Sequence, residues 1–303
     1  KIAVFIFIIA GAILFTMQHG MANSISLKTL APVWDSSVQY IPVIIYGMLG
    51  FELVSSSSDE MIDPARDVPR SIFISGFIII VLYMAATVAV LAALPADEID
   101  LVEGLVDTLK MFFGFDDNGK IFVFILGIAA LYTFFSNGVT WALGCNRAIA
   151  EAAVEGELPG LLGLESKSRG TPVGAAVAMG IFGSLTLLLY GYLANSNEDL
   201  FWSLFAFSAV IFLLPYIGML FAFIRSRKLD IDRTRPYRVP GSDGMAIFLA
   251  YVCIAVLALS IALFIYIPGE GLQLQVLLGA LVMIMIGEGL IRYSETQNRS
   301  RSE

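Results

Sequence analysis

Two glycines, a glutamate and four consecutive serines interrupt an apolar segment of this chain, which reads Tyr46-Gly-Met-Leu-Gly-Phe-Glu-Leu-Val-Ser-Ser-Ser-Ser-Asp-Glu60. If the segment lies in a membrane, backbone that leaves the helix there exposes N–H and C=O groups, each at a cost of several kcal/mol. Such a break persists only where it lines a cavity whose occupant uses those groups. The pattern therefore predicts a ligand site at the break.

Gly47 and Gly50 suit a short unwound strand. Its carbonyl oxygens could accept hydrogen bonds from a substrate ammonium, and the N–H groups of a helix that restarts near Ser55 could bind a carboxylate. Acceptors and donors so close together suit a zwitterion. Two glycines three residues apart also occur at close helix–helix contacts, but the added glutamate and serines favour a substrate-binding site.

Glu52 is an acid within the apolar segment, where insertion of a charge costs about 2.5–3.5 kcal/mol. By contrast, Glu288 has Arg292 four residues later, which predicts a structural ion pair. Glu52 has no cation at the equivalent spacings. Because desolvation favours a neutral carboxyl group, we predict that Glu52 takes up and releases protons. Capping of the second half-helix is an alternative compatible with that role.

Three aromatic residues are candidates to enclose a substrate. Tyr46 directly precedes the first glycine, and Tyr216 follows Pro215, where a helix kink is expected. Trp141 could stack on a substrate or close a gate. Packing in the core or at the membrane interface is the alternative reading for each of the three.

The elements that must position these residues are membrane-spanning helices. The 303 residues are 58% hydrophobic and 15% charged, with mean hydropathy +0.82, whereas soluble domains carry about a quarter charged residues. Apolar runs long enough to cross the roughly 30 Å hydrocarbon core predict an all-α polytopic helical bundle, with a single transmembrane domain over 1–303. About eight spans are expected, near 2–17, 38–58, 70–94, 120–143, 173–194, 201–224, 245–267 and 272–291.

The distribution of basic residues predicts the orientation of the chain. If the loop after the second span is cytoplasmic and the sides then alternate, fourteen basic residues lie inside and three outside, with Lys1 set aside. This is a strong positive-inside signal. We therefore expect an integral protein of the plasma (inner) membrane with both ends of the chain in the cytoplasm.

Several functional classes are disfavoured. The chain has no Walker A loop for ATP-driven pumping, no CxxC pair or histidine cluster for a metal, and no nucleophile–base constellation of an enzyme; no cofactor is implied. The basic loop 225–244 indicates a membrane-surface connector next to anionic headgroups, not a nucleic-acid site. The amphipathic segment 101–113 is expected to cover the outer mouth as a lid or a packed cap. Gly156 and Pro159 should end the helix that follows the fourth span.

Three separated segments resemble the amino acid–polyamine–organocation superfamily. The first, Gly50-Phe-Glu with the loop Ser57-Ser-Asp-Glu-Met-Ile-Asp-Pro-Ala-Arg-Asp-Val-Pro-Arg70, is similar to that family's sixth helix and the loop after it. The others are Asn146-Arg-Ala-Ile-Ala-Glu151 with Gly156-Glu-Leu-Pro159, similar to the end of the eighth helix, and Arg235-Pro-Tyr-Arg-Val-Pro-Gly241, similar to the loop between helices ten and eleven. The Gly-x-Glu form points to the amino acid/polyamine or glutamate/GABA antiporter branch.

The resemblance implies twelve helices in a five-plus-five inverted repeat of the LeuT type, with substrate held between broken helices one and six. This chain would contain helices five to twelve. Since it begins with a lysine inside membrane sequence, an N-terminally truncated fragment is expected.

The resemblance also implies roles for single residues. Gly50 and Glu52 match the unwound segment and the acidic, proton-coupling position. Tyr46 matches an outer gate and Tyr216 an inner gate. Trp141 matches a substrate-stacking tryptophan. A further match, Lys1, falls on a lysine of helix five that replaces the sodium ion in proton-coupled relatives.

Together these features predict a secondary active transporter of amino acids or related amines, proton-coupled or working by exchange through alternating access. The expected partners are the substrate, protons and the lipid bilayer, with a homo-oligomer left open. The alternative is a truncated transporter half that serves as a structural partner subunit.

Overall fold

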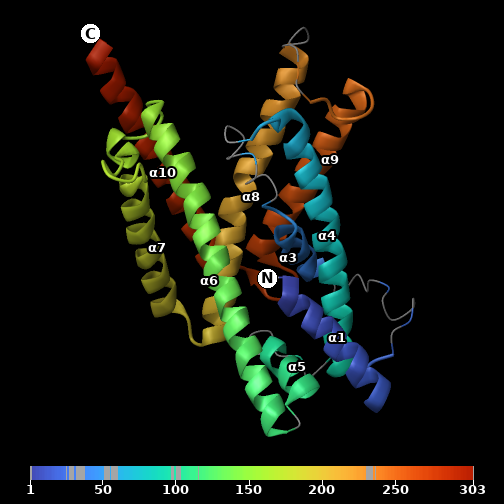
Figure 1. Cartoon of the computed structure of the whole chain (residues 1–303). Coiled ribbons are helices and arrows are strands. Elements are labelled where there is room, and N and C mark those ends of the chain that lie inside the picture. Colours follow the sequence, from blue (N-terminus) through green and yellow to red (C-terminus); the bar gives the residue numbers. More distant parts are fainter. Residues whose placement is uncertain are drawn as a thin grey trace. The chain divides into compact units, whose positions relative to one another are not determined.

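The computed structural model describes residues 2–24, 26, 31, 38–50, 55, 61–96, 99, 104–114, 116–229, 235 and 237–302. Helices make up nearly all of this part of the chain (Figure 1). In order, the elements are α1 (Ile2–His19), η1 (Val38–Tyr40), α3 (Ile41–Gly47), α4 (Pro64–Ala93), α5 (Gly104–Phe113), α6 (Asp117–Val154), η3 (Gly160–Gly163), α7 (Val173–Leu193), α8 (Asn197–Leu229), α9 (Asp243–Ile265), β1 (Tyr266–Ile267), β2 (Gly271–Leu272) and α10 (Leu274–Ser302).

Seven helices in the described ranges are long and apolar enough to cross a membrane, namely α1, α4, α6, α7, α8, α9 and α10. They overlap seven of the eight apolar ranges recognised in the sequence. The remaining range is 38–58, and the regular elements among its described residues are only η1 and the short α3. The prediction of an all-α, polytopic integral membrane protein is confirmed.

Internal contacts divide the chain into two compact units. The first comprises residues 1–32 and 70–143, and the second residues 33–69 and 144–303. The long helices α4 and α6 contribute to both units, because the boundaries fall within them.

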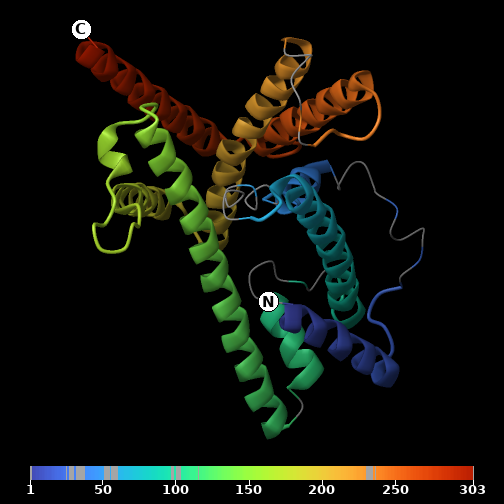
Figure 2. The same ribbon diagram turned by 45° about the horizontal axis from the view of Figure 1, so that its top comes forward.

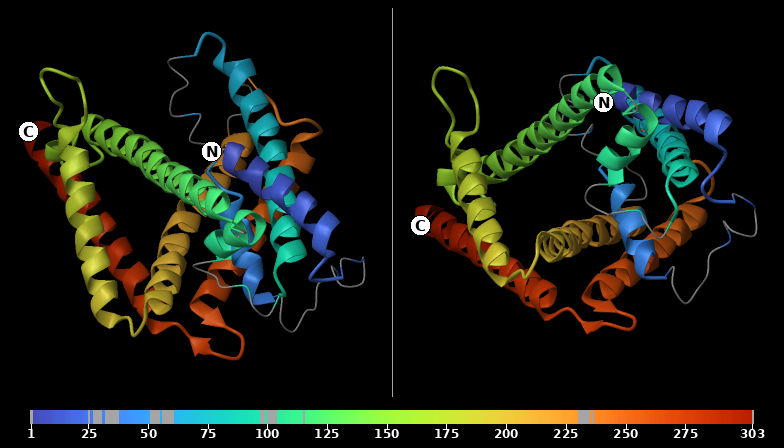
Figure 3. Two further views of the ribbon diagram at one scale, coloured as in Figure 1. Left: turned by 60° about the horizontal axis from the view of Figure 1, so that its bottom comes forward. Right: turned by 90° about the horizontal axis from the view of Figure 1, so that it is seen from below.

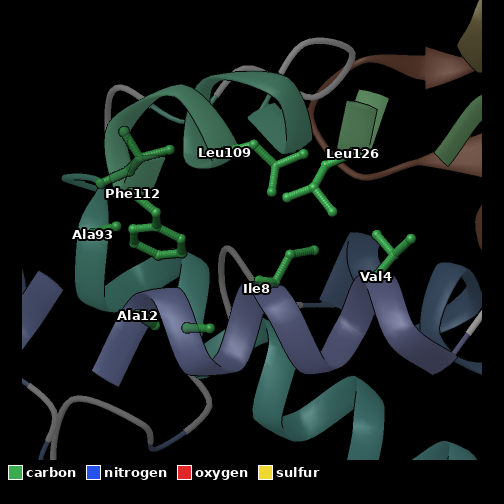
Figure 4. Close-up of a cluster of buried hydrophobic side chains, with 9 residues drawn as sticks. Val4, Ile8, Ala12, Ala93, Leu109, Phe112 and Leu126 are labelled. Atoms are coloured by element: carbon green, nitrogen blue, oxygen red, sulfur yellow. The ribbon is translucent and has the colours of Figure 1, made fainter. Parts of the chain in front are cut away.

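The core of the first unit forms where α1, α4, α5 and α6 meet (Figure 4). Figure 4 shows Leu109 and Phe112 pointing from α5 toward α1, and these side chains are 1% and 6% exposed. Gly11 allows the close approach, since a Cβ there would lie 2.7 Å from Phe113 Cζ. Of the two roles predicted for the amphipathic segment, the packed cap agrees with these contacts.

Asn23 caps the C-terminal end of α4. Its Nδ2 donates to the carbonyls of Leu91 and Leu94 at 2.7 and 2.6 Å, and its Oδ1 accepts from the Ala96 N–H at 3.3 Å. Because the last carbonyls of a helix lack intrahelical donors, one side chain supplies hydrogen bonds that the helix end cannot make itself. The contact ties the segment after α1 to the end of α4.

The core of the second unit lies between α3, α8, α9 and α10. Helix α8 packs against both α9 and α10, and α3 packs against α9 (Figure 2). One face of α8 is almost fully buried, since Ala209, Val210 and Leu213 are at most 2% exposed. Residues at this spacing share a helix face, so α8 is the central helix of this unit.

Gly156 ends α6, as the sequence predicts, and joins it to α10. Its φ of +86° is a left-handed conformation that glycine adopts without a steric penalty. Its carbonyl accepts hydrogen bonds from Ser294 Oγ at 2.7 Å and from Asn298 Nδ2 at 2.8 Å. The ends of α6 and α10 can be seen at the same side of this unit in Figure 3.

The sequence predicts that the segment 225–244 is a basic loop next to anionic headgroups, and at Arg227 this prediction is wrong. Helix α8 continues to Leu229, and the Arg227 side chain is only 4% exposed. Its guanidinium pairs with Asp243 at the start of α9 and lies 5.0 Å from the centre of the Phe223 ring. A buried charge needs a partner, so Arg227 joins two helix ends and does not face lipid headgroups.

Candidate functional site

The short helix α3 ends where the glycines of the broken segment begin. The Met48 N–H donates to the Ile45 carbonyl at 3.1 Å and the Leu49 N–H to the Tyr46 carbonyl at 3.2 Å, so the ladder tightens to an i−3 pattern. Gly50 then has φ of +102°, which takes the backbone out of the helix. A residue with a Cβ would be strained in that conformation.

This end of α3 has the chemistry of a site for an ammonium group. The last four carbonyls of a helix have no intrahelical donor and carry the negative end of the helix dipole. The carbonyls of Ile45 and Tyr46 accept one hydrogen bond each from the following turn, and every carbonyl oxygen has a second lone pair. The break can therefore offer several acceptors to a positively charged group.

Tyr46 and Tyr216, the two predicted gate residues, belong to one aromatic cluster. The Tyr46 ring lies edge-on to Phe205 and Phe212, with centroids 5.0 and 5.7 Å apart. Phe212 in turn lies edge-on to Tyr216 at 5.1 Å. Edge-to-face pairs stabilise by about 0.5–1.5 kcal/mol each beyond the burial of their area. The cluster thus connects α3 to α8 through the ring of Phe212.

Phe205 and Phe212 carry no polar group that would single them out in a sequence. The available signal is spacing, because Phe201, Phe205, Phe212 and Tyr216 follow one another on α8 at intervals of four, seven and four residues. These intervals place them on one helix face. Ordinary core packing produces the same stripe of aromatic residues. Only the contacts with Tyr46 of α3 show that this stripe faces the broken segment.

Pro215 lies next to this cluster, within α8. A proline has no N–H, so the Ile211 carbonyl lacks its usual i+4 donor. Helix α8 nevertheless runs as one element from Asn197 to Leu229. The missing ladder bond makes the stretch beside Tyr216 the point of α8 that bends most easily.

Of the other predicted site residues, two are described by the structure and two are not. Trp141 is half-buried in α6, in the part of that helix that belongs to the first unit. Ser55 is described and exposed. Glu52 and Lys1 lie outside the described residues.

The ion pair expected on α10 is confirmed. Arg292 Nε donates to Glu288 Oε1 at 2.8 Å. The two side chains are 75% and 55% exposed, and pairs of this kind contribute about 0–1 kcal/mol. Glu288 is therefore accounted for as a surface contact.

An apolar cavity of about 980 Å³ lies among α7, α8 and α10 in the second unit. Its lining side chains are apolar except for Thr186 and Ser208, so it offers little to a charged substrate. Phe205 is part of its wall and also contacts Tyr46. In the part of the chain that the structure describes, no group of three His, Cys, Asp or Glu residues could hold a metal ion.

Comparison with known proteins agrees with the resemblance found in the sequence. An antiporter of Lactococcus lactis, described as a probable agmatine/putrescine antiporter, is 33% identical over 284 residues, which are 91% of this chain and 60% of that protein. A gamma-aminobutyric acid permease of Bacillus subtilis is 26% identical over 236 residues, 78% of this chain and 48% of its own. A glutamate/gamma-aminobutyrate antiporter of Lactococcus lactis is 23% identical over 200 residues, which are 65% of this chain and 39% of that protein.

The chain therefore spans 60% or less of the length of these relatives. The profile of the family described as "Amino acid permease" matches residues 1–287. That range takes in the break after Gly47, the aromatic cluster and six of the seven long apolar helices in full. The resemblance of the broken segment to amino acid–polyamine–organocation transporters is thus confirmed, and the chain belongs to the amino acid permease family.

Proposed function

We propose that the protein is a secondary active transporter that moves amino acids or closely related amines across a membrane by alternating access. Membership of the amino acid permease family supports this, as do relatives whose names describe them as antiporters or permeases. The observation that carries the proposal is the end of α3. The helix stops at Gly47 beside an aromatic cluster, and Gly50 turns the backbone away.

The substrate group recognised at this break is a primary ammonium. Agmatine, putrescine, glutamate and gamma-aminobutyrate, the compounds in the relatives' names, all carry one. The last carbonyls of α3 attract positive charge. For a zwitterionic substrate, N–H groups near Ser55 bind the carboxylate.

The aromatic residues enclose and gate the substrate. Tyr46 is the outer gate and Tyr216 the inner gate, and Phe212 links the two rings. Trp141 stacks on the substrate. The break and these rings act as parts of one transporter domain.

Proton coupling falls to two residues that lie outside the described ranges, Glu52 and Lys1. Glu52 changes protonation as the site changes side, and Lys1 occupies the place of a coupling sodium ion. Basic residues are concentrated in and beside the α6–α7 and α8–α9 connections, which supports a cytoplasmic location for these connections. In this proposal both ends of the chain lie on that side of the plasma (inner) membrane.

The proposal is tested by uptake into proteoliposomes that contain the complete gene product. Labelled agmatine, putrescine, glutamate and gamma-aminobutyrate are offered to vesicles that are empty, preloaded with the same compound, or under a proton gradient. We expect uptake of at least one compound, stimulated by internal substrate for exchange or by the gradient for proton coupling. Uptake of none would refute transport of the compounds named for the relatives, and co-purification with a second transporter would then favour the subunit role.

The coupling role has its own test. In Glu52→Gln the carboxyl group is lost but the shape is kept, so we expect the rate to fall and its pH dependence to flatten. Normal rate and pH dependence in this variant would refute coupling through Glu52 and leave the transport proposal standing.

A further inference from the structure

A polar cavity of about 330 Å³ lies within the second unit, at the end away from Gly156. It forms where α7 ends, α8 begins and the β1–β2 hairpin leads into α10, and these elements lie together at the bottom of the left view in Figure 3. In the orientation proposed above, this end is extracellular. Its polar lining comes from Asn195, Asp199, Ser203, Gln273 and Gln275.

Hydrogen bonds between neighbouring elements hold the walls of this cavity in place. The hydroxyl of Tyr190, a residue that is 3% exposed, donates to the Gln275 carbonyl at 3.1 Å. Gly279 leaves room for that contact, because a Cβ there would lie 2.5 Å from the Tyr190 hydroxyl oxygen. The Gln273 N–H donates to the Ile265 carbonyl at 2.8 Å. These contacts join the start of α10 to α7 and to the end of α9.

The Asp199 side chain is exposed, and its carboxylate is available to the cavity. Ser196 caps α8, since its Oγ accepts from the Asp199 N–H at 3.0 Å. The Asp199 carboxylate itself makes no hydrogen bond or ion pair with any described residue. Within the same described ranges, no such bond is made by the side chains of Asn195, Ser203, Gln273 and Gln275.

The charge and size of the cavity select the ligand. Asp199 is the one charged residue among the described residues that line it, and a single carboxylate among amide and hydroxyl oxygens suits an ammonium group, which needs acceptors for three N–H donors. Protein sites for Ca²⁺ use six to eight oxygens, several of them from carboxylates. A volume of about 330 Å³ lies at the lower end of the range for small-molecule sites.

We propose that this cavity is a binding site for small primary amines, with Asp199 as the anion that holds the ammonium group. The site is separate from the break at α3 and lies on the face that meets external substrate first. It would raise the local concentration of amines at that face.

Butylamine is the probe, and butanol, of similar size but uncharged, is the control ligand. Binding to the purified complete gene product is followed by saturation-transfer NMR in wild type and in Gly50→Ala. Asp199→Asn and Glu198→Gln are each made in the Gly50→Ala background, so that the break does not contribute. Glu198 is the matched acid, because it neighbours Asp199 and does not line the cavity. We expect about a tenfold loss of butylamine affinity when Asp199→Asn is added to Gly50→Ala, no change when Glu198→Gln is added, and weaker binding at high salt.

The Gly50→Ala variant separates this cavity from the break. Butylamine binding that survives in Gly50→Ala but is lost in the Gly50→Ala/Asp199→Asn double variant supports the proposal. Loss of binding in Gly50→Ala itself, equal affinity in Gly50→Ala and Gly50→Ala/Asp199→Asn, or an equal loss in Gly50→Ala/Glu198→Gln would overturn it. Ser203→Leu fills the cavity and keeps the charge of Asp199. It should also weaken butylamine binding, and it provides a second test if Asp199→Asn destabilises the protein. None of these measurements requires transport, so failure here leaves the proposed function untouched.

Discussion

Tyr46 of α3 and Tyr216 of α8 lie edge-on to the same ring, that of Phe212, with centroids 5.7 and 5.1 Å away. Each tyrosine stands next to a weak point of its backbone: Tyr46 precedes the glycines that end α3, and Tyr216 follows the proline within α8. Because packed rings have discrete arrangements, a shift of the α3 end must change its contact with Phe212. This is a physical link between the broken helix and α8.

Replacing Phe212 by leucine tests that link. Leu keeps an apolar side chain but loses two edge-to-face pairs, so we expect a loss of about 1–3 kcal/mol in stability and slower transport with substrate binding retained. Thermal unfolding in detergent and proteoliposome uptake measure the two effects. Phe248→Leu is the control, since Phe248 is 61% exposed. Normal uptake in Phe212→Leu would remove Phe212 from the gating account.

Gly50→Ala tests the left-handed turn at the break. With φ of +102°, an added Cβ should cost about 1–2 kcal/mol and displace the carbonyls that we propose bind substrate. Gly76→Ala is the matched control, because Gly76 lies inside α4 with open space around it, and there the change should stabilise by about 0.5–1 kcal/mol. Thermal unfolding of the two variants measures the difference in stability. Equal effects at both positions would contradict a strained turn at Gly50.

Gly279→Ala tests the packing of α10. The new methyl group would lie 2.5 Å from the Tyr190 hydroxyl and 2.9 Å from Phe207 Cδ2, and such overpacking typically costs about 1–3 kcal/mol. Gly289→Ala, on the same helix with nothing within 4 Å, should be neutral or slightly stabilising. A comparison of the two unfolding temperatures checks this, and a neutral Gly279→Ala would show that α10 does not pack as described.

The ion pair between the buried Arg227 and the exposed Asp243 should contribute more to stability than the pair on α10, in which both side chains are exposed. Asp243→Ala leaves a 4%-exposed guanidinium without its anion, which should cost about 1–3 kcal/mol. Arg227→Met should cost less, because the Asp243 side chain is 60% exposed and can be hydrated. Glu288→Ala, which breaks the surface pair, should cost at most about 1 kcal/mol. Similar losses in all three variants would contradict the burial of Arg227.

Features set by local chemistry could be predicted from the sequence. The long apolar runs give the helices α1 and α4, the glycines give the end of α3, Gly156 gives the end of α6, and a spacing of four residues gives the Glu288–Arg292 pair. In each case the cause lies within the segment itself and needs no partner distant in the sequence.

Features set by partners distant in the sequence could not. Asn23 caps a helix end 68 residues later, Arg227 finds its anion sixteen residues away in α9, and Phe212 looks like any lipid-facing or core phenylalanine until α3 is placed beside it. Periodicity assigns a residue to a face of its own helix and does not say what covers that face.

The central claim is that the break at α3 binds the substrate of an amine or amino-acid transporter. The most direct measurement is exchange of labelled putrescine or gamma-aminobutyrate in proteoliposomes that contain the complete gene product as wild type, Gly50→Ala or Gly76→Ala. We expect exchange in wild type and Gly76→Ala, and at least a tenfold loss in Gly50→Ala at an equal amount of folded protein. Undiminished exchange in a folded Gly50→Ala protein would contradict the account.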